Sequence, residues 1–349
     1  MRALSATVIA GYAVLGAASA TAQTSAPADP LRAYVPSTVS PEAAALYARY
    51  RPFVLTADQQ IARTRAEIEA RYLAGEKAAD AGNAPLTALG LTTTEQELGG
   101  VKVLEVLPRD YRDDGTALIY LHGGGFIYGS IHSSLRGAAI MAHATGRRVF
   151  SIEYAVAPKG NWKIATDQVV AVYRALLAQG RKPASIGIFG ESAGGNLTAA
   201  ATLKLRDQGL PMPAGLILIS PATDLTRAGD TYVTLAQADP VLPPGNVQPG
   251  FDLYADPADQ KNPYVSPVYG DFSKGYPPTL IQGGTKEILI SDMVRLHRAI
   301  RAAGSESRLE LYEGMPHAFP GMMVMAGAPE GKAAMDEAAA FWRERLKGR

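Results

Sequence analysis

The amino-acid sequence predicts an α/β fold built on a mostly parallel central sheet with helices on both faces. Short apolar runs that are typical of buried strands alternate along the chain with longer segments of helical pattern. Strands that are apolar on both faces indicate a parallel sheet, because helices must then cover each side. The chain has 349 residues, 47% of them apolar, which is enough for one large core with an accessory layer.

Residues 1–22 differ in composition from the rest of the chain. One positive side chain, Arg2, precedes an uncharged stretch, and Ala20-Thr21-Ala22 fits a small-x-small cleavage site. We interpret the segment as a secretory signal peptide. A membrane anchor is the alternative, which Gly11, Tyr12, Gly16 and the many alanines of the run disfavour. No later run approaches membrane length, so we expect no stable membrane span after signal removal.

Composition narrows the compartment and the partners. The sequence contains no cysteine, which excludes disulfides, thiolate metal sites and cysteine nucleophiles. An exported protein without cysteines suits a bacterial periplasm or secretion. The net charge of +1, without a basic block, predicts no nucleic-acid partner. Asp and His residues show no ligand spacing and no phosphate-binding glycine loop is present, so we expect no metal and no organic cofactor.

The elements follow in order after the predicted signal. Residues 23–90 combine a linker rich in Ala, Pro, Ser and Thr with a helical pattern from 41 to about 82, which we expect to form cap helices. Residues 91–349 form the expected catalytic domain. Its strands are expected at 101–106, 117–121, 148–152, 186–189, 216–219, 279–282 and 308–312. Helices are expected at 162–179, directly after 192, at 291–303, and at the C-terminus through Phe341 and Leu346.

The segment from about 224 to 271 interrupts this alternation. It contains seven prolines and only short helical pieces. Long irregular segments in compact domains usually cover a functional site, so we predict a cap insertion here.

The most specific motif is Gly190-Glu191-Ser192-Ala193-Gly194. It stands between an apolar strand pattern and a segment of helix formers, which is the context that a nucleophile elbow requires. Glycines flank the turn because larger side chains would collide there. A free serine is a poor nucleophile, so the motif predicts a base, an acid and donors for an oxyanion.

The oxyanion donors are expected in His122-Gly123-Gly124-Gly125. These residues follow the apolar run that ends at Leu121, and glycines at a strand end expose backbone N–H groups. A glycine triplet alone is weak evidence, because many turns contain one. Its place after a buried strand and upstream of the elbow makes it specific.

The base is expected to be His317, the only one of the five histidines in a loop after the last predicted strand. Two acids follow Gly284. Glu287 lies at the carboxyl edge of its strand, where active sites of such sheets form, and we favour it. Asp292 lies at the start of the next helix, where N-terminal capping is its ordinary role.

These motifs together resemble the hormone-sensitive-lipase-like esterases, a branch of the α/β-hydrolases. Residues 122–125 (HGGG), 190–197 (GESAGGNL), the Glu287 segment and 314–319 (GMPHAF) carry the resemblance, which extends from about Pro36 to the C-terminus. It implies an α/β-hydrolase fold with a helical cap made by the N-terminal helices and 224–271. The site residues that it implies are the nucleophile Ser192, the base His317, the acid Glu287 and the oxyanion donors Gly124, Gly125 and Ala193, with His122 structural.

One stretch departs from the family pattern. Where the family has Tyr-Arg-Leu-Ala-Pro-Glu, this chain reads Tyr-Ala-Val-Ala-Pro-Lys at 154–159, so that an Arg and a Glu are missing. The change affects pocket detail rather than the reaction. The methionines at 315, 322, 323 and 325 either line an adaptable acyl pocket or pack in the core.

The function expected from these residues is a serine carboxylesterase acting on small-molecule esters of short to medium chain. A lactonase or amidase with the same triad is one alternative, because the chemistry is shared. A small-ligand-binding protein on a hydrolase scaffold is another, which the presence of all three triad members disfavours. The sequence does not predict the oligomeric state.

Overall fold

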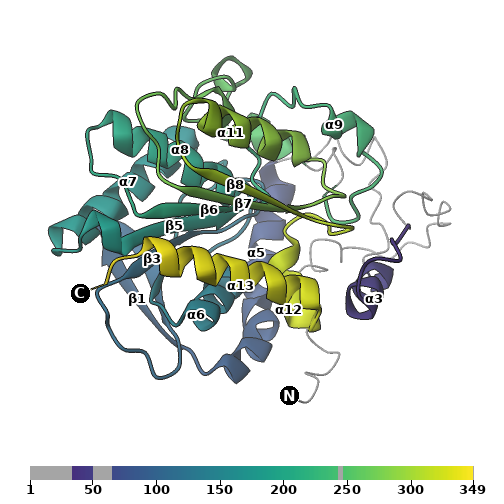
Figure 1. Ribbon diagram of the computed structural model, residues 1–349, viewed down its shortest axis with the longest axis horizontal. Helices are drawn as coiled ribbons and strands as arrows, with labels where there is room; N and C mark the ends of the chain where they lie inside the picture. Colours follow the sequence, from purple (N-terminus) through teal and green to yellow (C-terminus); the bar gives the residue numbers. More distant parts are fainter. Residues whose placement is uncertain (1–33, 50–64, 243–246, 349) are drawn as a thin grey trace.

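The computed structural model describes residues 34–49, 65–242 and 247–348. The predicted signal peptide, residues 1–22, lies outside the described residues. Eight strands form one sheet in the order β1-β2-β4-β3-β5-β6-β7-β8 (Figure 1). Their bounds are β1 Thr92–Leu98, β2 Val101–Leu107, β3 Ala117–Leu121, β4 Val149–Ile152, β5 Ile186–Glu191, β6 Gly215–Ile219, β7 Thr279–Gly284 and β8 Ser307–Tyr312.

The sheet is parallel from β4 to β8 and antiparallel only at the β1 edge. β1 pairs with β2, and β2 with β4, in antiparallel register. The other pairs, from β3·β4 to β7·β8, are parallel. The predicted α/β class with a mostly parallel sheet is therefore confirmed.

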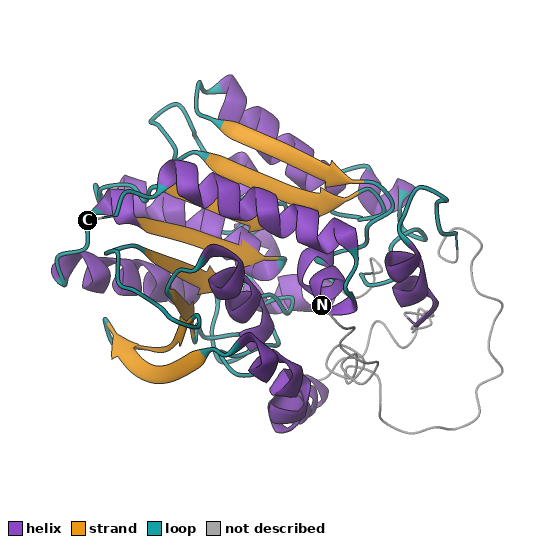
Figure 2. Cartoon of the chain, turned by 60° about the horizontal axis from the view of Figure 1, so that its bottom comes forward, coloured by secondary structure: helices purple, strands orange, loops and turns teal. Residues whose placement is uncertain are grey.

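Helices cover both faces of the sheet (Figures 1 and 2). On β3, Ile119 and Leu121 belong to one core cluster, while Leu118 and Tyr120 belong to a second. Alternation along a strand sends neighbouring side chains to opposite faces. The first face is covered by α7 (Trp162–Ala178), α8 (Ala193–Asp207) and α11 (Ile290–Ala302), and the second by α6 (Leu135–Thr145) and α13 (Pro329–Arg345).

The remaining helices belong to the N-terminal part, to the insertion and to the segment after β8. In the N-terminal part, the predicted helical pattern forms α3 (Pro41–Arg49) and α5 (Arg65–Asn83). The predicted insertion contains only α9 (Thr231–Thr234), α10 (Gln248–Tyr254) and two single 3₁₀ turns among its described residues. The last short helix, α12 (Phe319–Ala326), packs against α3 through a shared apolar cluster.

The predicted site residues follow the carboxyl ends of neighbouring strands. Ser192 comes directly after β5, Glu287 three residues after β7, and His317 five residues after β8. Because these strands run parallel, their carboxyl ends meet at one edge, which is where sites form in such sheets.

Candidate active site

Ser192 occupies a sharp turn between β5 and α8. Its backbone has φ 55° and ψ −120°, a strained conformation for a residue with a side chain, and its N–H donates to the carbonyl of Ile219 (2.8 Å). The flanking glycines are required by space. A Cβ on Gly190 would collide with the carbonyl of Gly194, and one on Gly194 with the carbonyl of Leu121. The predicted reason for these glycines is therefore visible as backbone-to-backbone contact.

The three predicted triad residues form one hydrogen-bonded chain. Ser192 Oγ lies 2.9 Å from His317 Nε2, and His317 Nδ1 lies 2.9 Å from Glu287 Oε2. A carboxylate only accepts hydrogen bonds, so the proton belongs on Nδ1 and Nε2 is left to accept the serine hydroxyl. The arrangement can move a proton from Ser192 to His317.

Glu287 is fully buried and held from two further directions. Its second oxygen, Oε1, accepts the N–H of Gly284 (2.6 Å) and the hydroxyl of Ser220 (2.7 Å). These contacts leave Oε2 facing His317. A buried carboxylate without such donors would carry a large desolvation cost.

The environment of His317 favours its charged form. Burial alone would lower the pKa of this imidazole, but the hydrogen bond and charge of Glu287 outweigh it, with added charge from Asp239 and Glu191. The pKa of His317 is therefore raised above its ordinary value of 6.5.

The loop that carries two of the predicted oxyanion donors begins beside the nucleophile, because a Cβ on Gly123 would lie 3.3 Å from Ser192 Cβ. Gly124 and Gly125 have φ of 116° and 61°, and Ala193 begins α8. None of their three N–H groups donates a hydrogen bond to another residue in the described part of the chain. The helix dipole adds positive potential at Ala193. Backbone N–H groups without an acceptor are the kind of donor that can stabilise an oxygen that gains negative charge.

His122 has a structural environment, as expected. It is fully buried, and burial lowers its pKa to about 4, so the ring is neutral near pH 7. Its Nδ1 donates to the carbonyl of Gly123 (2.8 Å), and its ring stacks on Tyr154 with centroids 4.2 Å apart. The Tyr154 hydroxyl donates to the His122 carbonyl (2.7 Å), which fixes the start of the glycine loop.

The insertion contacts the glycine loop directly. Phe126 stacks on Tyr254 of α10 with centroids 3.9 Å apart. A Cβ on Gly250 of the same helix would overlap the carbonyl oxygen of Gly125. The insertion therefore packs on the backbone that carries the predicted donors.

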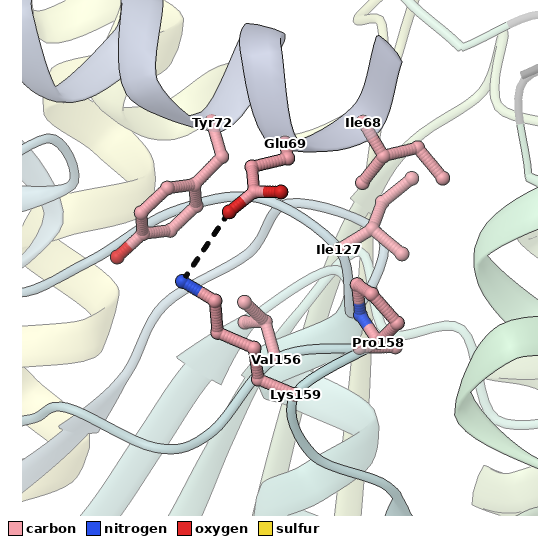
Figure 3. Close-up of a pocket in the computed structure, with 8 residues that line it drawn as sticks. Ile68, Glu69, Tyr72, Ile127, Val156, Pro158 and Lys159 are labelled. Atoms are coloured by element: carbon pink, nitrogen blue, oxygen red, sulfur yellow. Dashed lines mark ion pairs between the residues drawn. The ribbon is translucent and has the colours of Figure 1, made fainter. Parts of the chain in front are cut away.

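A cavity of about 340 Å³ lies beside Ile127, two residues after the glycine loop (Figure 3). Its walls come from α5, from Ile127 and from the segment after β4 that contains Val156. In the cavity rim, Lys159 Nζ lies 4.0 Å from Glu69 Oε1, as the dashed line in Figure 3 marks. Lys159, which departs from the family pattern, thus pairs with α5.

Two expectations have clear outcomes. Asp292 lacks the N-terminal capping role expected for it, because α11 begins without a side-chain cap. Its carboxylate instead accepts the N–H of Asp224 (2.9 Å) and the hydroxyl of Tyr232 (3.2 Å), which attaches the insertion to α11. Met315, Met322 and Met323 are buried in the cluster between α3 and α12, which favours the packing interpretation.

Sequence reasoning missed two polar residues at the site, Ser220 and Asp239. Both are fully buried, and Asp239 Oδ1 accepts the N–H groups of Val241 (2.8 Å) and Leu242 (3.1 Å). Burial beside Glu287 raises the pKa of Asp239 to about 6, although the charge of His317 opposes the shift. A buried acid in a predicted cap segment has no motif of its own, so no sequence signal identified it.

Residues 34–49, 65–242 and 247–348 contain no helix with the length and apolarity needed to cross a bilayer. They also contain no group of three His, Asp or Glu side chains placed to hold a metal ion.

Comparisons with known proteins identify the family of the chain. Residues 118–321 match the model of a family described as having the α/β hydrolase fold. An acetyl-hydrolase from Streptomyces hygroscopicus is 34% identical over 278 residues, which cover 79% of this chain and 90% of that protein. The crystal structure of an esterase from the bacterial hormone-sensitive lipase family has a TM-score of 0.76 at 30% identity, over 88% of this chain and 99% of the other. The esterase E25 superposes with a TM-score of 0.83 at 29% identity, over 94% and 99%. The chain therefore belongs to the α/β-hydrolase fold family, within the branch of the hormone-sensitive-lipase-like esterases.

Proposed function

We propose that this protein is a serine carboxylesterase that hydrolyses esters of short to medium acyl chain through an acyl-enzyme on Ser192. The observation that carries the proposal is the unbroken chain from Ser192 Oγ through His317 to Glu287. The relatives named acetyl-hydrolase and esterase support the reaction class.

In the acylation half, His317 Nε2 takes the proton of Ser192 while Oγ attacks the ester carbonyl carbon. The carbonyl π electrons move to the oxygen, which the N–H groups of Gly124, Gly125 and Ala193 stabilise. When the C–O bond to the alcohol breaks, His317 returns the proton to the leaving oxygen. Ser192 is left as an ester of the acyl group.

In the deacylation half, water attacks the acyl-enzyme and His317 takes its proton. Collapse of the second tetrahedral intermediate releases the carboxylic acid and returns the proton to Ser192 Oγ. Throughout, Glu287 keeps the Nδ1 proton in place and stabilises the imidazolium.

The insertion and the relatives support the preference for short to medium acyl chains. The described insertion contributes only a four-residue and a seven-residue helix, which is little apolar surface for a long acyl chain. A name among the relatives, acetyl-hydrolase, points the same way.

Hydrolysis of p-nitrophenyl esters from acetate to palmitate tests the proposal. We expect the highest kcat/KM at short or medium chains, and a loss of roughly 10⁴-fold or more in Ser192→Ala. Mass spectrometry after rapid quenching should find the acyl group on the Ser192 peptide. Wild-type activity in Ser192→Ala would refute the mechanism, and a maximum at palmitate would refute the size preference. Faster turnover of lactones or anilides would favour the lactonase or amidase alternative.

A further inference from the structure

The carboxyl end of β6 contacts the turns that carry all three triad residues. Ile219 accepts the N–H of Ser192 (2.8 Å), and the next residue, Ser220, donates its own N–H to the carbonyl of Gln282 in β7 (2.7 Å). Ser220 is fully buried. β6 therefore fixes the elbow on one side and the strand of the acid on the other.

The Ser220 hydroxyl joins the acid loop to the base loop. It donates to Glu287 Oε1 (2.7 Å) and accepts the N–H of Ala318 (3.0 Å), the residue directly after His317. One side chain thus contacts the carboxylate and the backbone beside the imidazole. A shift of either loop would break one of these two bonds.

The backbone at these points is held in an unfavourable conformation. Ser192, Ser220 and Ala318 have φ of 55°, 47° and 53°, and they are three of the six non-glycine residues with positive φ in the described ranges. Such residues persist only where the surroundings fix them, and they concentrate at functional sites. The Ser220 hydroxyl is one of the contacts that hold this region.

We propose that Ser220 is a positioning residue for ester hydrolysis, whose hydroxyl holds Glu287 Oε2 against His317 Nδ1 and fixes the His317 loop. The inference rests on the proposed function. Without the hydroxyl, Oε1 of Glu287 keeps only the Gly284 N–H, and the carboxylate can rotate away from the imidazole.

A structural role alone would give a different result. Loss of the hydroxyl leaves the buried N–H of Ala318 without its partner, which destabilises the fold in any case. The discriminating measurement is the acidic limb of kcat/KM against pH, because it reports the pKa of His317. The charged groups that face His317 are Glu287, Asp239 and Glu191, and a change at Ser220 alters only the placement of the first.

The experiment compares Ser220→Ala and Ser220→Gly with Ser151→Ala. Glycine removes the hydroxyl and accepts the positive φ, so it gives a second variant if alanine fails to fold. Ser151 is a matched control, because it is also fully buried but its hydroxyl has no hydrogen-bond partner in the described part of the chain. Melting temperatures establish a temperature at which every variant is folded.

We expect kcat to fall about 10- to 100-fold in both Ser220 variants, with KM little changed. The acidic limb should move to lower pH, because His317 loses part of the interaction that raises its pKa. Ser151→Ala should match the wild type in both. An unmoved acidic limb in the Ser220 variants would overturn the proposal, whatever their kcat. A wild type without Ser192-dependent esterase activity would instead overturn the proposed function.

Discussion

Replacement of Glu287 by Gln tests how the site sets the tautomer of His317. The two side chains have the same shape, but Gln has one oxygen and one NH2 group. Both partners at Oε1, the Gly284 N–H and the Ser220 hydroxyl, donate to it, so the amide oxygen will occupy that position. The NH2 group must then face His317 Nδ1, where the carboxylate now accepts at 2.9 Å.

This arrangement forces the proton of the imidazole onto the wrong nitrogen. With Nδ1 accepting from the amide, the neutral ring carries its hydrogen on Nε2, which then cannot accept the Ser192 proton. The equivalent change in a serine protease lowers kcat about 10⁴-fold, or about 5 kcal/mol of barrier, and we expect a similar loss here.

Steady-state kinetics on a p-nitrophenyl ester measure the effect, with melting temperature as a check on folding. Asp292→Asn is the matched control, because Asp292 is also fully buried but contacts Asp224 and Tyr232. Its kcat should stay within about tenfold of wild type, since it leaves the triad hydrogen bonds intact. Loss of activity in Asp292→Asn with retention in Glu287→Gln would refute the assignment of the acid.

Three further predictions concern pH and packing. The pKa of His317 is raised above 6.5, and the neutral imidazole is the base. The value of kcat/KM should therefore increase with pH through an apparent pKa above 6.5. A midpoint below 6.5 would contradict the raised pKa. Asp239→Asn should increase the melting temperature at pH 8, because the rise of the Asp239 pKa from 3.8 to about 6 makes the folded state lose about 3 kcal/mol as pH increases through that window. Asp239→Asn should also move the acidic limb of the kcat/KM profile to lower pH, because the charge of Asp239 helps to raise the pKa of His317. A melting temperature at pH 8 below that of the wild type would contradict the predicted stabilisation. Gly194→Ala should destabilise the fold by about 3 kcal/mol or more, because the new Cβ collides with the Leu121 carbonyl. The control is Gly75→Ala in α5, whose new Cβ meets no atom within 4 Å and should leave the stability unchanged or increase it. Thermal unfolding measures both.

The core of the fold could be predicted because its strands have a clear pattern. Strands such as 117–121 and 216–219 are continuous apolar runs, and the structure buries every residue of both. The edge strand Thr92–Leu98 was not predicted individually. Its first four residues are all exposed. Their polar Thr and Glu side chains produce neither an apolar run nor a clear alternation.

The positions of the triad residues were readable for a similar reason. Ser192 and His317 stand in short motifs whose spacing along the chain is set by the strand order. Ser220 gave no such signal, because its effect arises from a hydroxyl that touches Glu287 and Ala318, 67 and 98 positions away in sequence. The conformation of a turn and the direction of one hydroxyl depend on tertiary contacts that a single sequence does not reveal.

The contact between α10 and the glycine loop limits how the insertion can be exchanged. Gly250 lies so close to the Gly125 carbonyl that no side chain fits between them, and Tyr254 stacks on Phe126. A chimaera that takes its insertion from a relative with another substrate range must therefore keep a glycine and an aromatic side chain four residues apart on this helix. Elsewhere the insertion can vary, but at this point the insertion and the loop that carries the predicted oxyanion donors can only be exchanged together.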